Sequence, residues 1–98
     1  MKITKENLWI YILKMLMARP MYAYEISTIL NQKFGFSTAK VTVYVVLYKM
    51  RREGLIKKKE EKSVLGRPNR KYYSITKKGK LEFLKGRNFL QDMLNKLL

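Results

Sequence analysis

The sequence contains no cysteine and no histidine, and it has few acidic residues. Without thiols or imidazoles it can form no disulfide, no thiolate nucleophile and no histidine-based zinc site. Its glycines are isolated from one another, so no glycine-rich loop can hold a nucleotide phosphate. The acids show no paired spacing that suggests acid–base catalysis. We therefore expect a protein that is not an enzyme and needs no cofactor or metal ion.

Long apolar runs are also missing. The segment from Leu8 to Ala18 is apolar apart from Lys14, and it is far shorter than the roughly 20 residues that a membrane span needs. The opening residues, MKITKENLWI, lack the order of a signal peptide. The sequence thus predicts a cytoplasmic protein without a membrane partner.

What the chain has in excess is positive charge. Lys and Arg number 22 against seven Asp and Glu, which gives a net charge of +15. From Lys49 to Arg87 there are fifteen basic residues and four acids, so this segment carries +11 of the total. A basic surface concentrated in one segment is typical of a protein that binds nucleic acid.

Apolar periodicity and capping residues predict helices over about 5–18, 22–33, 39–53 and 77–97, with Thr4, Ser37 or Thr38, and Thr76 as caps. Residues 55–60 and 70–75 are predicted strands of a β-hairpin, with Gly66 and Pro68 in the turn. This order predicts a mainly α fold with a small β-hairpin, the winged helix-turn-helix, with a long C-terminal dimerisation helix. We expect residues 1–76 to be the DNA-binding domain and 77–98 the dimerisation helix of one compact unit.

In such a fold the third helix reads bases in the major groove, and hydroxyls, a lysine and an apolar side chain suit that task. Thr38 and Thr42 also have a plainer interpretation, as a cap and a surface residue. The DNA contacts expected on this helix are Thr38, Lys40, Thr42, Tyr44 and Lys49.

The hairpin, or wing, carries the stretch GRPNRKYYSITKKG, which is dense in positive charge. It suits a phosphate backbone or a minor groove, although a solvated loop would have the same composition. Two lysines in the first turn of the last helix are disfavoured by the helix dipole, which indicates an external anion nearby. The expected contacts of the wing and the following turn are Arg67, Arg70, Lys71, Tyr72, Lys77 and Lys78.

The first helix is apolar nearly all round, which predicts burial on more than one side. In a small domain the second covering is expected from another copy of the chain. Trp9 on this helix suits either a core position or the wall of a pocket. The residues expected at the dimer interface are Leu8, Trp9, Ile12, Leu84, Leu90, Met93, Leu94 and Leu97.

Three stretches resemble the PadR-like family of transcriptional regulators. Ala23-Tyr24-Glu25 is similar to the family's Gly-Tyr-Glu, residues 42–56 to its recognition helix and exit, and residues 66–79 to its wing. The resemblance implies a homodimeric winged-helix repressor on double-stranded operator DNA, associated with a prokaryotic chromosome. Lys77 and Lys78 replace the acids common in the family.

The sequence is also compatible with another function and with a small-molecule effector. A chromosome-coating or RNA-binding structural protein without sequence preference would have the same high charge. The sequence also allows a small-molecule effector but gives no support for one, because multidrug-binding relatives use a tryptophan on the last helix, whereas Trp9 lies on the first.

Overall fold

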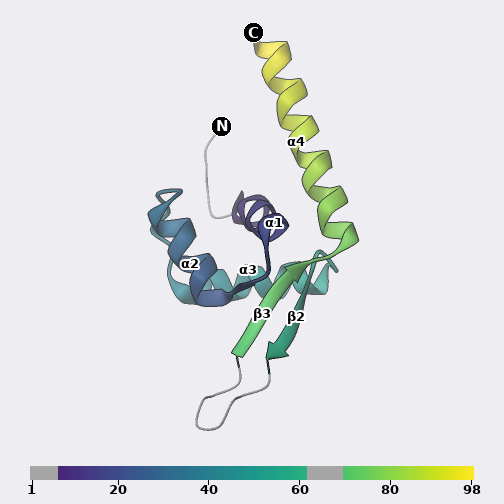
Figure 1. Cartoon of the computed structure of the whole chain (residues 1–98). Helices are drawn as coiled ribbons and strands as arrows, with labels where there is room; N and C mark the ends of the chain where they lie inside the picture. The colour runs from purple at the N-terminus through teal and green to yellow at the C-terminus, as the bar shows by residue number, and fades with distance from the viewer. Residues whose placement is uncertain (1–6, 62–69) are drawn as a thin grey trace.

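The computed structural model describes residues 7–61 and 70–98. Its elements, in chain order, are α1 (Leu8–Ala18), β1 (Met21–Tyr22), α2 (Ala23–Gln32), α3 (Lys40–Arg52), β2 (Ile56–Glu61), β3 (Arg70–Ile75) and α4 (Lys77–Leu97). The first three helices form the body, and the wing strands β2 and β3 and the helix α4 leave it in opposite directions (Figure 1). The predicted fold, a mainly helical winged helix-turn-helix with a long last helix, is confirmed.

The core lies where α1, α2 and α3 meet the inner face of the wing. Each helix contributes apolar residues at helical spacing, as predicted, because residues three and four apart share one face. The largest fully buried side chains are Leu8, Ile12, Leu13, Ile26, Leu30, Val43, Leu47 and Ile56.

Two of these core residues correct a prediction. Leu8 and Ile12 were expected at the dimer interface, but both are 0% exposed within a single copy. They therefore have no surface to offer to a second chain. The sequence shows that α1 is apolar on every side, but it does not show which sides the other helices of the same chain cover.

The sheet has a third strand that the sequence pattern did not predict. β1 pairs antiparallel with β3, with Met21 opposite Tyr73 and Tyr22 opposite Tyr72, so the strand order is β1-β3-β2. Two residues are too few to show alternation. The strand ends where the Tyr22 amide donates to Glu25 Oε1 at 3.1 Å and α2 begins.

The start of α3 also differs from the prediction. Ala39 is the N-cap residue, and no side chain caps the helix. Thr38 instead lies 6% exposed, with its backbone amide and carbonyl bonded to the Asn31 side chain at 3.0 and 3.2 Å. A side chain so buried has little surface for DNA, so its assignment as a contact is corrected.

Thr76 caps α4 as predicted. Its hydroxyl oxygen accepts from the Gly79 amide at 3.0 Å. From there α4 first packs on α1 and then continues beyond the body (Figure 1). The expected cap Thr4 and the wing residue Arg67 lie outside the described residues. Within residues 7–61 and 70–98, no helix combines the length and the apolar character that crossing a bilayer requires.

Candidate nucleic-acid interface

The outward face of α3 is rich in exposed side chains that could enter a groove. Val41, in its first turn, is 74% exposed, and Lys40 beside it is exposed as well. Tyr44 and Tyr48 follow at four-residue spacing and are also exposed. Because an α-helix fits the major groove of B-DNA, this face is suited to contact bases.

The predicted contacts of α3 do not lie together. Tyr44 lines the hollows beside the wing. Thr42 and Lys49 line a separate hollow of about 490 Å³, which they share with Trp9. Thr42 and Lys49 therefore face the α1 side of α3, whereas Tyr44 faces the wing.

Tyrosines gather where the wing leaves the body. Six of the chain's seven lie here, five of them exposed or half-buried and Tyr73 buried, and we call them the tyrosine face: Tyr22, Tyr24, Tyr44, Tyr48, Tyr72 and Tyr73. The Tyr22 and Tyr24 rings are parallel, with centroids 6.0 Å apart, and Tyr72 stands edge-on to Tyr22 at 6.3 Å. The hydroxyl group of a tyrosine can donate a hydrogen bond to a phosphate oxygen while its ring packs against a sugar.

Polar contacts hold the wing against this face. The Tyr22 hydroxyl donates to Glu61 Oε2 at 2.5 Å, and this bond raises the pKa of Tyr22. The Arg70 guanidinium lies 5.4 Å from the centre of the Tyr22 ring. Arg70 and Tyr72, both predicted DNA contacts, lie two residues apart on β3, and the pairing of β1 with β3 brings Tyr22 beside both.

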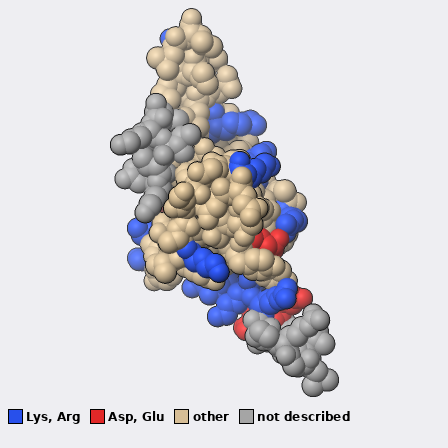
Figure 2. Space-filling model, turned by 90° about the vertical axis from the view of Figure 1, so that its left-hand side faces the viewer, with Lys and Arg blue, Asp and Glu red and all other residues tan. Residues whose placement is uncertain are grey.

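Basic side chains surround the tyrosine face. On the side of the molecule seen in Figure 2, Lys and Arg gather over the lower part, where the wing leaves the body, and the upper end of α4 has few. The hollows beside α3 are lined by cations from three elements, Arg51, Lys58 and Lys71. The surface combines positive charge with hydrogen-bonding aromatic groups, the composition that a nucleic-acid backbone requires.

Comparison with known proteins agrees with this geometry. The model of the "Transcriptional regulator PadR-like family" matches residues 12–85. The chain belongs to the PadR-like family. No match was found among curated proteins.

Solved structures resemble this PadR-like chain over most of its length. A PadR-like transcriptional regulator from Bacillus cereus is 37% identical, with 95% of this chain and 92% of that one covered and a TM-score of 0.73. A putative transcriptional regulator from Thermoplasma acidophilum is 25% identical, with coverage of 95% and 88% and a TM-score of 0.80. Bacillus subtilis PadR, solved with operator DNA, is 24% identical, with coverage of 84% and 47% and a TM-score of 0.73. The family consists of transcriptional regulators, so the prediction that the chain is not an enzyme is confirmed.

One basic residue has an internal partner instead of an expected external one. Lys78 Nζ donates to the carbonyl oxygen of Glu53 at 2.7 Å, and Lys77 remains exposed. The end of α3 carries partial negative charge, so this contact offsets the unfavourable position of Lys78 at the start of α4. This bond gives the position of Lys78 an internal explanation, and the contacts of Lys77 and Lys78 with DNA stay predictions.

Three members of this interface were not predicted from the sequence: Tyr24, Tyr48 and Arg51. A usable signal existed for two of them, because Tyr44, Tyr48 and Arg51 are spaced by four and three residues and so share one face of a helix. Lys58 belongs to a run of three lysines, Lys57 to Lys59, and only the strand register tells which of them faces α3.

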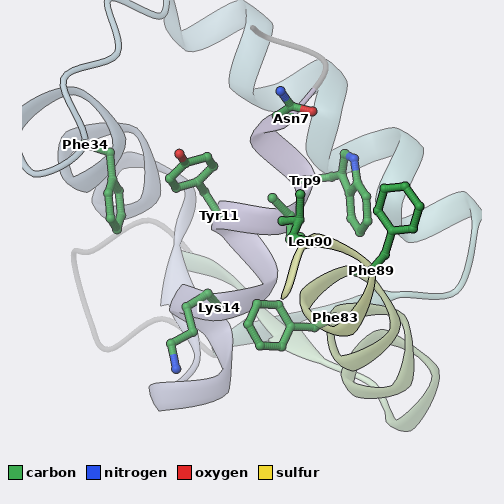
Figure 3. Close-up of a pocket in the computed structure, with 10 residues that line it drawn as sticks. Asn7, Trp9, Tyr11, Lys14, Phe34, Phe83, Phe89 and Leu90 are labelled. Carbon is green, nitrogen blue, oxygen red and sulfur yellow. The ribbon is translucent and has the colours of Figure 1, made fainter. Parts of the chain in front are cut away.

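A further hollow of the regulator lies away from the wing, between α1 and α4. It measures about 510 Å³ and is mostly apolar. Trp9, Tyr11, Phe83 and Phe89 line it, and Figure 3 shows the Trp9 and Phe89 rings close to each other at one end. Trp9 is thus part of the wall of a hollow, half-buried rather than in the core. Among the described residues, no group of three or more acids could hold a metal ion.

Proposed function

We propose that this PadR-like regulator is a sequence-specific repressor that binds double-stranded DNA as a homodimer. The third helix enters the major groove, and the basic wing contacts the backbone or a minor groove. The observation that carries the proposal is the joining of the exposed face of α3 to the basic tyrosine face at the base of the wing. A relative of the same fold, Bacillus subtilis PadR, was solved with operator DNA.

The chemistry of α3 supports base reading. Lys40 supplies a donor for guanine, Thr42 a hydroxyl, and Val41 a methyl-bearing surface for the thymine methyl group. Arg70, Lys71 and the wing lysines offer charge without a pattern of mixed donors and acceptors. In the proposed complex the helix therefore supplies sequence preference and the wing supplies affinity.

The exposed apolar surface of α4 supports a homodimer. Phe89 is 67% exposed and Leu97 is 78% exposed, although both are large apolar side chains. Large apolar side chains exposed on one helix support an interaction site there. The proposed interface consists of α4, which is the dimerisation helix of residues 77–98, and the hollow beside α1. Of the predicted interface residues, six keep surface for this role: Trp9, Leu84, Leu90, Met93, Leu94 and Leu97.

Two-fold symmetry of the protein implies an operator with two-fold symmetry. Each copy would place one α3 in the major groove of one half-site. The half-sites should then lie about 10 base pairs apart, centre to centre, or a small multiple of that.

Selection of bound sequences from a pool of random duplexes tests the proposal. We expect a consensus made of two inverted half-sites. Retention of duplexes without any consensus would instead favour a chromosome-coating protein, and stronger retention of RNA would favour an RNA-binding one. A reporter gene placed behind the selected operator tests the sign of regulation, because a repressor should lower its expression.

A further inference from the structure

Lys58 occupies a strand position where its neighbours belong to the core. In the register of the wing, Ile56 pairs with Ile75 and Lys58 pairs with Tyr73. Side chains two residues apart on a strand point to the same face. Lys58 therefore shares the inner face of the wing with Ile56 and Tyr73, both buried. A position of this kind normally holds an apolar residue.

The charges around Lys58 are mostly of its own sign. Burial, and then the charges of Arg51 and Lys71, lower the pKa of Lys58. Glu60 acts in the opposite direction, as the weakest of these influences, and it faces Lys71 across the strands.

Ion pairing elsewhere in the chain does not relieve this repulsion. The described part of the chain has ion pairs at Arg19–Glu25, Lys85–Glu82 and Lys96–Asp92, and these include none of the three cations. Arg51, Lys58 and Lys71 are all exposed, so solvent screens part of their repulsion, and an anion bound between them would remove more of it.

Space for an anion is present beside these cations. Two hollows meet there and share Tyr44, Lys58 and Tyr73 in their walls. The smaller, of about 190 Å³, adds Arg51 from α3, and the larger, of about 530 Å³, adds Lys71 from β3. The ammonium and guanidinium groups are the donors that a phosphate oxygen accepts from most strongly, and the Tyr44 hydroxyl adds a neutral donor.

We propose that Arg51, Lys58 and Lys71, with the Tyr44 hydroxyl, form a binding site for a single phosphodiester group of the DNA backbone. We call it the Lys58 site. Its assignment to DNA rests on the proposed function, whereas its preference for a phosphate-type anion rests on the geometry alone. One phosphate held between α3 and the wing would set the angle at which the reading helix enters the groove, since backbone contacts fix orientation.

The test compares Lys58→Met with Lys57→Met. Methionine keeps the apolar stem of the side chain and removes its charge. Lys57 is the adjacent residue, equally charged and exposed, and it faces the other side of β2, opposite Ser74. Binding to a duplex of mixed sequence is measured at several salt concentrations. Lys58→Met should bind about tenfold more weakly, and its salt dependence should flatten by about 0.9 in log–log slope. Equal losses in the two variants would overturn the Lys58 site.

Arg51→Met supplies a second variant from a different element, so that a defect of the wing alone cannot imitate the result. It should lose affinity to the same degree as Lys58→Met, and the double variant should lose little more than either single one. Simple addition of the two losses would mean that the residues contact separate phosphates, and the shared site would be wrong.

A separate arm uses inorganic phosphate as the probe and needs no DNA. At constant ionic strength set with sodium chloride, phosphate should raise the thermal midpoint of the wild type and not that of Lys58→Met. If the wild type binds no duplex at all, the proposed function fails, and this arm alone decides the site. If phosphate then raises the thermal midpoints of the wild type and of Lys58→Met equally, the Lys58 site is wrong.

Discussion

Lys78 Nζ lies 2.7 Å from the carbonyl oxygen of Glu53, so the first turn of α4 is bonded to the last turn of α3. The proposed recognition helix, α3, and the proposed dimerisation helix, α4, are thereby joined where they meet. A change in the direction of α4 would act directly on the end of α3.

Lys78→Met should therefore reduce stability. Loss of the hydrogen bond leaves a terminal carbonyl of α3 without its cation, and we expect the free energy of unfolding in urea to fall by about 0.5–1.5 kcal/mol. Lys77→Met is the matched control, because that neighbour is exposed and has the same charge. The prediction is wrong if both variants unfold at the same urea concentration.

Gly79 is expected to tolerate no side chain. A Cβ at this position would lie 2.2 Å from the Leu55 carbonyl oxygen and 2.8 Å from an Ile75 side-chain carbon. Since backbone cannot move aside as a side chain can, Gly79→Ala should cost about 2–3 kcal/mol of stability. The control is Gly86→Ala, where the nearest atom is the flexible end of Ile10 at 2.9 Å. That variant should stay within about 1 kcal/mol of the wild type, because alanine also favours the helix.

The proposed homodimer can be tested at Leu94, which is exposed on α4. Leu94→Asp should give a folded monomer, because a carboxylate buried at an apolar interface loses its hydration. Asn95→Asp adds the same charge one residue away and should remain dimeric. Light scattering with circular dichroism measures mass and fold together. A wild type that is monomeric at micromolar concentration would contradict the homodimer.

Substitutions in the wing and in the proposed recognition helix should have different effects: the first on affinity for any duplex, the second on sequence preference. Arg70→Ala and Lys71→Ala should weaken binding to operator and scrambled duplexes nearly alike, with the salt slope flatter by about 0.9 for each lost contact. Lys40→Ala and Thr42→Ala should change sequence preference, because a good base contact discriminates by about 1–3 kcal/mol.

Lys85→Ala on α4 serves as the control of equal charge and should bind as the wild type does. The division of roles is reversed if the wing variants lose only the operator and the helix variants lose both duplexes equally.

Glu25 should make stability depend on pH. Its carboxylate accepts from Arg19 at 2.8 Å and from the Tyr22 amide at 3.1 Å, and these bonds hold the pKa of Glu25 below its ordinary 4.5. A pKa that is lower in the folded state gives stabilisation that is complete above pH 4.5 and is lost as the pH falls through the folded value.

Glu25→Gln should thus lower the free energy of unfolding at pH 7 by about 0.3–1 kcal/mol, and the difference from the wild type should vanish in strong acid. Glu82→Gln, which removes an exposed partner of Lys85, should change little at either pH. A deficit of Glu25→Gln that persists in strong acid would point to packing instead of charge.

The sequence by itself determined the elements whose causes are local. Apolar spacing along one helix predicted the buried Val43, Leu47 and Met50, and Thr76 capped α4 because a cap needs only the residues that follow it. The turn at Gly54 has a φ of +75°, a value that a glycine signals on its own. The family resemblance also rested on short stretches of sequence.

Only the tertiary structure decided which residues from distant elements meet. Arg51 on α3, Lys58 on β2 and Lys71 on β3 surround connected hollows because strand register and helix packing bring them there, and no spacing in the sequence records it. The same holds for Leu8 and Ile12, which neighbouring helices of one copy cover completely. Side-chain chemistry and short-range periodicity are visible in the sequence. Which side chains are buried, and which charged groups lie near one another, depends on long-range contacts that form only in the folded state.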